Sequence, residues 1–209
     1  PRLKAYAIKG LHYYQNAFST DPNVSTNLLA LAGALTELYH THCSPDWCWF
    51  EPYLTYANAT LPHALFLAYD STGNNEFLTV ATETLGFLIQ VQVRRGMFVP
   101  IGNKGWYHKG GKRPLYDQQP VEAATMIAAA SSAFRLTGDK NYQNIAHIVF
   151  NWFFGKNLKG VVLYDRTTGG CFDGINPEGL NLNQGAESTI SYLLARIEIE
   201  QLHLLKDAL

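Results

Sequence analysis

Hydrophobic residues recur along most of the chain at intervals of three and four positions, which is the period of an α-helix with one buried face. Period-two alternation, which is typical of strands, is confined to a short stretch near 161–164. The helical period covers seven segments: 2–18, 24–42, 53–71, 75–93, 118–137, 140–156 and 184–206. We therefore expect an all-α fold of about seven helices.

An internal repeat groups these helices in pairs. Residues 72–77 align with residues 137–142, and in both copies a glycine suited to ending a helix precedes an Asn or Asp that can cap the next one. Such a short connection predicts an antiparallel αα-hairpin. Tandem hairpins of this kind indicate an (α/α)6 toroid, a ring of helices in two layers.

The links between the predicted hairpins are long and cover roughly 43–52, 95–117 and 157–183. In arrays of hairpins the short turns and the long loops lie on opposite faces, and binding residues usually gather on the long loops. Seven helices are fewer than the twelve of a complete toroid. Because the chain begins at Pro1 rather than Met, we expect residues 1–209 to form one domain, a partial or truncated toroid from the C-terminal part of a longer protein.

The composition excludes several classes of function. The chain has 16 basic and 17 acidic residues and a net charge of -1, so no basic surface for nucleic acid or an anionic membrane is expected. Its apolar runs are too short for a membrane span, and its N-terminus lacks a signal-peptide core. These features favour a cytoplasmic protein. The phosphate-binding glycine motifs of nucleotide-dependent proteins are also absent from the sequence.

Cysteine usage gives no sign of a disulfide scaffold or a metal centre. Cys43, Cys48 and Cys171 are few and odd in number, which favours reduced thiols. His40 and His42 precede Cys43 closely, but a zinc site needs a second pair of ligands at a suitable spacing, and the sequence does not supply one. We expect neither a metal nor a cofactor.

Aromatic, amide and carboxylate side chains gather in three stretches, 46–51, 105–122 and 169–187, that lead into predicted helices. Aromatic rings stack on sugar C–H faces, amides bind vicinal hydroxyls, and carboxylic acids act as general acids and bases. The candidate catalytic carboxylates are Glu51, Asp117, Glu122 and Glu187. The candidate substrate-binding residues are Trp47, Trp49, Tyr56, Asn58, Trp106, Tyr107, Gln118, Asp173, Asn183 and Gln184. Core packing and helix capping would explain the same residues without a binding function.

Several motifs together resemble a helical module found at the C-terminus of some bacterial and archaeal proteins classed as glycosyltransferases. The module is similar in layout to six-hairpin glycosidases, and the resemblance covers roughly residues 44–200. It rests on Trp47-Cys-Trp-Phe-Glu51, Leu61-Pro62, Gly105-Trp-Tyr107, Asp117-Gln-Gln-Pro-Val-Glu-Ala123, Thr168-Gly-Gly-Cys171 and Asn183-Gln-Gly-Ala-Glu-Ser-Thr189. It implies a carbohydrate-linked toroid with a GT-B glycosyltransferase domain preceding it. The chain departs from the module's pattern at Ala57 and Thr60, where Asp and Arg are expected.

Two classes of function follow. The first is a carbohydrate-active domain with a glycosidase-like mechanism, in which two carboxyls roughly 6.5–9.5 Å apart would invert and a pair about 5–5.5 Å apart would retain the anomeric configuration. The second is a non-catalytic module that binds an oligosaccharide or supports a glycosyltransferase domain. A metal-dependent toroid of the cyclase type is a weaker third hypothesis, because the ligand spacing is poor.

Overall fold

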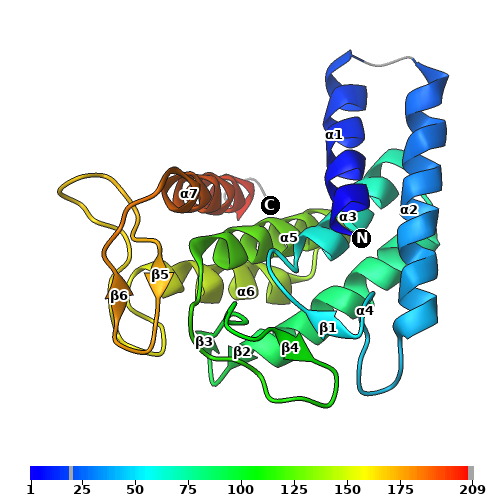
Figure 1. Cartoon of the computed structure of the whole chain (residues 1–209). Coiled ribbons are helices and arrows are strands. Elements are labelled where there is room, and N and C mark those ends of the chain that lie inside the picture. The colour runs from blue at the N-terminus through cyan, green and yellow to red at the C-terminus, as the bar shows by residue number, and fades with distance from the viewer. Residues whose placement is uncertain (19–20, 207–209) are drawn as a thin grey trace.

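The computed structural model describes residues 1–18 and 21–206, and in this part of the chain it contains seven α-helices (Figure 1). They are α1 (Arg2–Phe18), α2 (Pro22–His42), α3 (Thr60–Thr72), α4 (Asn75–Gln92), α5 (Pro120–Thr137), α6 (Lys140–Phe150) and α7 (Ala186–Lys206). A short 3₁₀ turn, η1 (Asn151–Phe153), continues α6. The predicted all-α class is confirmed.

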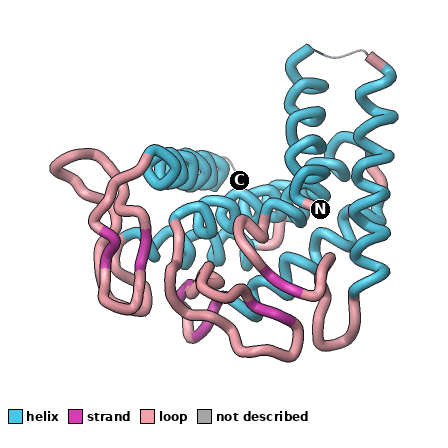
Figure 2. The backbone as a smooth tube through the Cα atoms, in the orientation of Figure 1, coloured by secondary structure: helices cyan, strands magenta, loops and turns pink. Residues whose placement is uncertain are grey.

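Six two-residue strands lie in the loops of the described chain and pair in three antiparallel ladders (Figure 2). The pairs are β1 (Tyr53–Leu54) with β4 (Tyr107–His108), β2 (Val93–Arg94) with β3 (Met97–Phe98), and β5 (Gly174–Ile175) with β6 (Leu180–Asn181). The prediction of a helix from residue 53 was therefore wrong at its start. Ala57 lies in the left-handed region with φ 47°, which interrupts any helix before Thr60.

The short turns inside the hairpins have the predicted chemistry. Gly73 and Gly138 end α3 and α5 in the left-handed conformation, with φ 69° and 71°. Asn74 and Asp139 then cap α4 and α6, because each side chain accepts a hydrogen bond from a backbone N–H two residues later. Glycine suits these positions because it lacks the Cβ atom that makes positive φ unfavourable.

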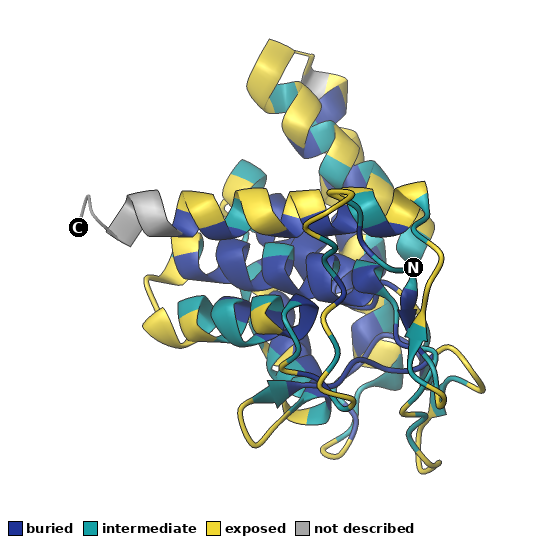
Figure 3. Cartoon of the chain, turned by 90° about the vertical axis from the view of Figure 1, so that its left-hand side faces the viewer, coloured by how far each residue is buried: buried dark blue, intermediate teal, exposed yellow. Residues whose placement is uncertain are grey.

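The helices form two layers of a curved array. Helices α1, α3, α5 and α7 contact one another in succession, and α2, α4 and α6 pack behind them as hairpin partners. Helix α5 lies at the centre and is buried along most of its length (Figure 3). Ala123, Ala129, Ala130 and Ala133 are fully buried there, and these small side chains let the neighbouring helices approach closely.

The first and last helices of the inner layer carry exposed apolar residues. They include Leu3, Tyr6 and Tyr13 on α1 and Ile190, Leu194 and Ile197 on α7. A groove of about 450 Å³ lies between these helices. None of the helices in the described ranges is both long and apolar enough to cross a membrane. A cytoplasmic location stays a prediction.

Candidate functional site

Backbone pairing joins the three loops that the sequence singles out. The loop before α3 pairs with the loop before α5 through β1 and β4. The loop before α5 pairs with the loop before α7 through two hydrogen bonds between Gln118 and Ile175, of 2.9 and 3.0 Å. The loops 43–59, 99–119 and 154–185 therefore form one continuous surface, here called the rim, at the N-terminal ends of α3, α5 and α7.

A charged cluster lies at one end of the rim, where α1 begins. The guanidinium of Arg2 donates to Glu51 at 3.0 Å, to the side chain of Asn58 at 3.1 Å, and to the carbonyl of Tyr56 at 2.8 Å. The amide of Asn58 approaches Glu122 at 3.5 Å. Two of the predicted catalytic carboxylates, Glu51 and Glu122, are thus brought into one cluster. Both are buried and held by internal partners.

Glu122 lies in the first turn of α5, where the helix dipole favours an acidic residue. Burial raises its pKa to about 7, although hydrogen bonds from Ala57 and Asn58 and the charge of Arg2 act in the opposite direction. The backbone N–H of Ala57 donates to the Glu122 carboxylate. This contact ties the left-handed turn before α3 to the start of α5.

A polar cavity of about 190 Å³ opens where the second and third loops meet. Most of the residues that line it carry a carboxylate or an amide side chain. The lining residues are Asn103, Asp117, Gln118, Gln119, Asp173, Gly174, Ile175, Asn176 and Asn181. The cavity therefore places two carboxylates, Asp117 and Asp173, among several amides, which is a suitable lining for a polyhydroxylated ligand.

Asp117 has an unusual backbone conformation, with φ 58°. Of the four non-glycine residues with positive φ in the described chain, three lie in the rim: Ala57, Trp106 and Asp117. Residues in this region are strained, and such strain is common at binding and catalytic sites. The second loop is held in this shape by the hydrogen bond from the N–H of Asn103 to the carbonyl of Asp117, at 3.1 Å.

Asp173 is held in its ionised form. Burial raises its pKa, but hydrogen bonds from Ser188, Asn183 and the backbone of Gly185 outweigh this effect and lower the pKa below its usual value. The contacts from Ser188 and Gly185 are both 2.7 Å long. Asp173 thus accepts one backbone N–H, that of Gly185 just before α7, and one side-chain hydroxyl, that of Ser188 in the first turn of α7.

An aromatic pair stands beside the charged cluster. The rings of Tyr56 and Trp106 lie 6.3 Å apart at 38°, and the Arg2 guanidinium sits 5.2 Å from the centre of the Tyr56 ring. Tyr56 is 48% exposed and Trp106 is partly exposed. Among the aromatic residues predicted to bind sugar, Tyr56, Trp106 and Tyr107 are those whose side chains are not buried.

Three of the predicted binding residues are part of the core instead. Trp49 is fully buried, and Trp47 packs edge-on against Phe87 and Tyr107. Gln118 is 1% exposed, and its amide bonds both the indole of Trp152 at 2.9 Å and the carbonyl of Leu115 at 2.7 Å. The prediction that Trp47 and Trp49 stack on sugar needs correction, because buried rings cannot form such a surface. Gln118 borders the polar cavity, although its amide is bonded inside the protein.

The remaining predicted residues lie just before α7 and in its first turn. Asn183 donates to Asp173, and Gln184 bonds Asp165 at 3.1 Å and Thr168 at 2.8 Å, so both amides organise the third loop. Glu187 is exposed and, within the described residues, has neither an ion pair nor a side-chain hydrogen bond. It does not line the polar cavity.

Several residues of the cavity and of the charged cluster were not predicted from the sequence. Asn103, Gln119, Asn176 and Asn181 line the cavity, and Arg2 joins the charged cluster. The richness in amides before the last helix was a usable signal for Asn176 and Asn181. Arg2 has no comparable signal, because it lies far from the motifs in sequence. Within residues 1–18 and 21–206, His, Cys, Asp and Glu side chains form no group of three suited to a metal.

Comparison with solved structures identifies the architecture. A GH76 alpha-mannanase of Bacteroides thetaiotaomicron superposes with a TM-score of 0.65 and 16% identity over 96% of this chain and 54% of that chain. The fold is a partial (α/α)6 toroid. A glycoside hydrolase family 76 mannosidase of the same organism gives a TM-score of 0.64, 13% identity and coverage of 96% and 54%.

A cellobiose 2-epimerase of Bacillus thermoamylovorans also matches the partial toroid, with a TM-score of 0.65, 12% identity, and coverage of 93% of this chain and 52% of that one. The chain thus spans about half the length of the structures it matches. No family model matches the sequence, and no curated protein does. The matched proteins are a mannanase, a mannosidase and an epimerase, so the link to glycosyltransferases stays a prediction.

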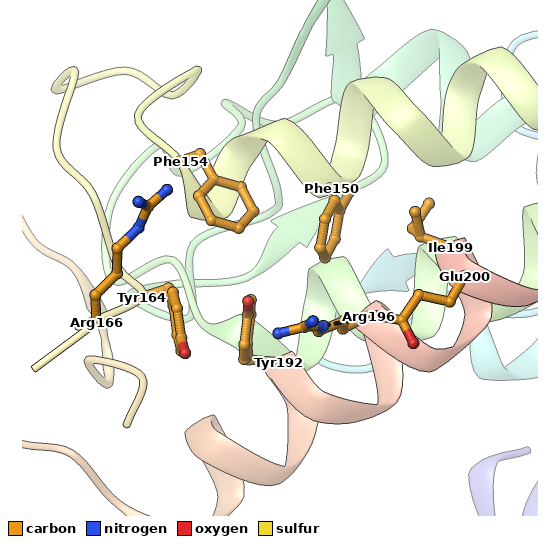
Figure 4. A pocket seen from close by; sticks show the side chains of 8 residues that line it. All are labelled: Phe150, Phe154, Tyr164, Arg166, Tyr192, Arg196, Ile199 and Glu200. Atoms are coloured by element: carbon orange, nitrogen blue, oxygen red, sulfur yellow. Dashed lines mark hydrogen bonds and ion pairs between the residues drawn. The ribbon is translucent and has the colours of Figure 1, made fainter. Parts of the chain in front are cut away.

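A larger cavity of about 610 Å³ lies beside the partial toroid's last helix, between α7 and the end of α6 (Figure 4). Tyr164 and Tyr192 stack there at 4.3 Å, and Arg196 pairs with Glu200 at 2.8 Å. None of the residues predicted from the sequence lines it. This cavity lies beside α7 and shares no lining residue with the polar cavity of the rim.

Proposed function

We propose that the rim of this partial toroid binds a glycan and that the polar cavity holds one of its sugar residues. The observation that carries the proposal is the cavity itself, with two carboxylates and several amides around about 190 Å³. This is the liquid volume of about six water molecules, a space suited to one sugar ring. The exposed Tyr56 and Trp106 rings would contact a neighbouring sugar along the same rim.

The carboxyls of the cavity suggest how a reaction would be divided between them. Acid–base cleavage of a glycosidic bond needs one protonated and one ionised carboxyl. The lowered pKa of Asp173 suits the ionised role, and Asp117 is the second acidic residue that lines the cavity. Glu51 and Glu122 do not line this cavity, because they lie in the charged cluster with Arg2 and Asn58.

A non-catalytic glycan-binding or scaffolding module is the second candidate. The hydrogen bonds that Asp173 accepts from Gly185 and Ser188 favour this alternative, because a purely structural role at the start of α7 also explains them. In either case the module could accompany a glycosyltransferase domain, which remains a prediction. Sequencing the gene upstream of the codon for Pro1 would test for such a domain.

The experiment separates binding from turnover. We would titrate the chain with manno-oligosaccharides and cello-oligosaccharides by calorimetry, and analyse the products of long incubations for hydrolysis and epimerisation. The sugars are chosen because matched structures are a mannanase and a cellobiose epimerase. We expect Asp117→Asn to weaken binding at least tenfold, whereas Glu178→Gln, at an exposed position outside the cavity, should leave it unchanged.

Each outcome has a defined meaning. Binding with turnover that Asp117→Asn abolishes supports the enzyme, and binding without turnover in any protein supports the module. Equal affinity in the wild type and in Asp117→Asn would show that the cavity is not the sugar site. Absence of binding to both series of oligosaccharides would overturn the proposal for those two sugar classes.

A further inference from the structure

Cys43 and Cys48 flank a tight hairpin at the end of α2. Ser44 and Trp47 form an antiparallel bridge with both hydrogen bonds made, N–H of Ser44 to the carbonyl of Trp47 at 3.1 Å and N–H of Trp47 to the carbonyl of Ser44 at 2.9 Å. In an antiparallel register the next facing pair is one residue outward on each side. That pair is Cys43 and Cys48.

This position in the ladder suits a disulfide. Facing residues next to a hydrogen-bonded pair have Cα atoms about 4.5 Å apart, and their side chains point to the same face. Disulfides usually join Cα atoms about 4.4–6.8 Å apart. The extended backbone of Cys43, with φ −63° and ψ 139°, is consistent with the register.

The thiols themselves are close together. Both sulfurs approach the same acceptor, the carbonyl oxygen of Ser44, at 4.0 Å from Cys43 and 3.7 Å from Cys48. Both residues are partly exposed and unpaired, whereas Cys171 is buried. The chain thus contains two partly exposed thiols, Cys43 and Cys48, and one buried thiol, Cys171, which serves as an internal control in a thiol count.

We propose that Cys43 and Cys48 are a redox-active pair that closes a reversible disulfide across the hairpin. The thiolate of one cysteine attacks the S–S bond of a small-molecule disulfide such as oxidised glutathione and releases one glutathione thiolate. The second cysteine thiolate then attacks the mixed disulfide and releases the other. Two protein thiols lose two protons and two electrons, and the small-molecule disulfide is reduced to two thiols.

The local environment sets the rate of this exchange. Burial raises the pKa of Cys48, and the neighbouring Cys43 and Glu83 raise it further. The hydroxyl of Tyr39 donates a hydrogen bond to the Glu83 carboxylate at 2.6 Å. The thiolate is the nucleophile, so oxidation should be slow at neutral pH and should accelerate about tenfold between pH 7 and pH 8.

The disulfide would fix a hairpin that supports the rim. Trp47, inside the hairpin, donates its indole N–H to the carbonyl of Glu51 at 2.7 Å. Glu51 in turn binds Arg2 in the charged cluster. The oxidised protein should therefore show a higher Tm than the reduced protein, and a reductant should reverse the difference.

The test is a thiol count on the folded chain. The protein is incubated with oxidised glutathione at pH 8, the remaining thiols are blocked after unfolding, and the intact mass and peptides are measured. We expect the number of free thiols per chain to fall from three to one, and the remaining thiol to be that of Cys171. The intact mass before blocking should be about 2 Da lower than that of the reduced chain. Burial raises the Cys171 pKa to about 12, so this thiol should stay reduced.

Single substitutions complete the test. Cys43→Ser and Cys48→Ser should each retain one glutathione as a stable mixed disulfide, because the second attacking thiol is missing. Circular dichroism would establish that both variants are folded. Three free thiols in the wild type after prolonged oxidation, a stable glutathione adduct on it, or consumption of Cys171 in the folded protein would each overturn the proposal.

Discussion

The carboxylate of Glu122 accepts a hydrogen bond from the backbone N–H of Ala57, which lies 65 residues earlier in the chain. The contact joins the first turn of α5 to the left-handed turn before α3. It is buried, and the side chain of Asn58 adds a second donor at 3.5 Å. One internal carboxylate thus connects two loops of the rim.

The raised pKa of Glu122 predicts a stability that declines with pH. Burial raises this pKa to about 7 in the folded protein, from about 4.5 in the unfolded chain. The fold therefore favours the protonated acid. This contribution is complete below pH 4.5 and is lost as the pH rises to about 7, by up to about 3 kcal/mol for a pKa difference of about 2.5.

Urea unfolding at pH 5 and pH 8 would measure this effect. Glu122→Gln should remove most of the pH dependence, because glutamine does not titrate. Glu178→Gln, at an exposed position, should retain the wild-type pH dependence. A free energy of unfolding of the wild type that is equal at both pH values would contradict the expectation.

The pair of Arg2 and Glu51 should be energetically coupled. Their atoms are 3.0 Å apart, and the side chains are only 15% and 11% exposed, so solvent screens the pair weakly. We expect a coupling of about 1–2 kcal/mol in a double-mutant cycle with Arg2→Met and Glu51→Gln. The exposed pair of Arg196 and Glu200 is the control, with an expected coupling below about 0.5 kcal/mol.

Gly174 should be required for joining the second and third loops. It has φ 152°, and a Cβ atom there would lie 2.1 Å from the carbonyl oxygen of Gln118. Gly179 has a similar φ of 143° but open space around it. We expect Gly174→Ala to lower the free energy of unfolding by about 2 kcal/mol more than Gly179→Ala, since only the first adds a clash. Equal losses in chemical denaturation would show that the close approach of Gly174 to Gln118 is not required for stability.

The two acids of the cavity should differ in their effect on stability. Asp173→Ala removes the acceptor for the start of α7 and should cost about 1–2 kcal/mol in the free energy of unfolding. Asp117→Asn should change stability by less than about 0.5 kcal/mol, because asparagine tolerates the left-handed backbone. Thermal unfolding of both variants would check this. A larger loss for Asp117→Asn would indicate that Asp117 has a structural role.

The placement of individual motif residues could not be predicted from residue type. Trp49 and Trp106 both lie in aromatic-rich motifs, yet the first is fully buried and the second reaches the surface. Gln118 and Asp117 are adjacent in sequence, yet the amide bonds Trp152 inside the core and the carboxylate borders the cavity. Composition indicates a polar, aromatic rim. Composition does not indicate whether a given side chain of the rim points into the core or toward solvent.

The sequence by itself determined the helices, their hairpin turns and the loops that carry the polar residues. These features depend on local rules: the period of apolar residues, left-handed glycines such as Gly73 and Gly138, and the caps that follow them. Tertiary structure alone decided that Arg2 contacts Glu51 and that Asp117 and Asp173 line the same cavity. Such contacts depend on the packing of helices and on the pairing of Gln118 with Ile175, which no local pattern encodes.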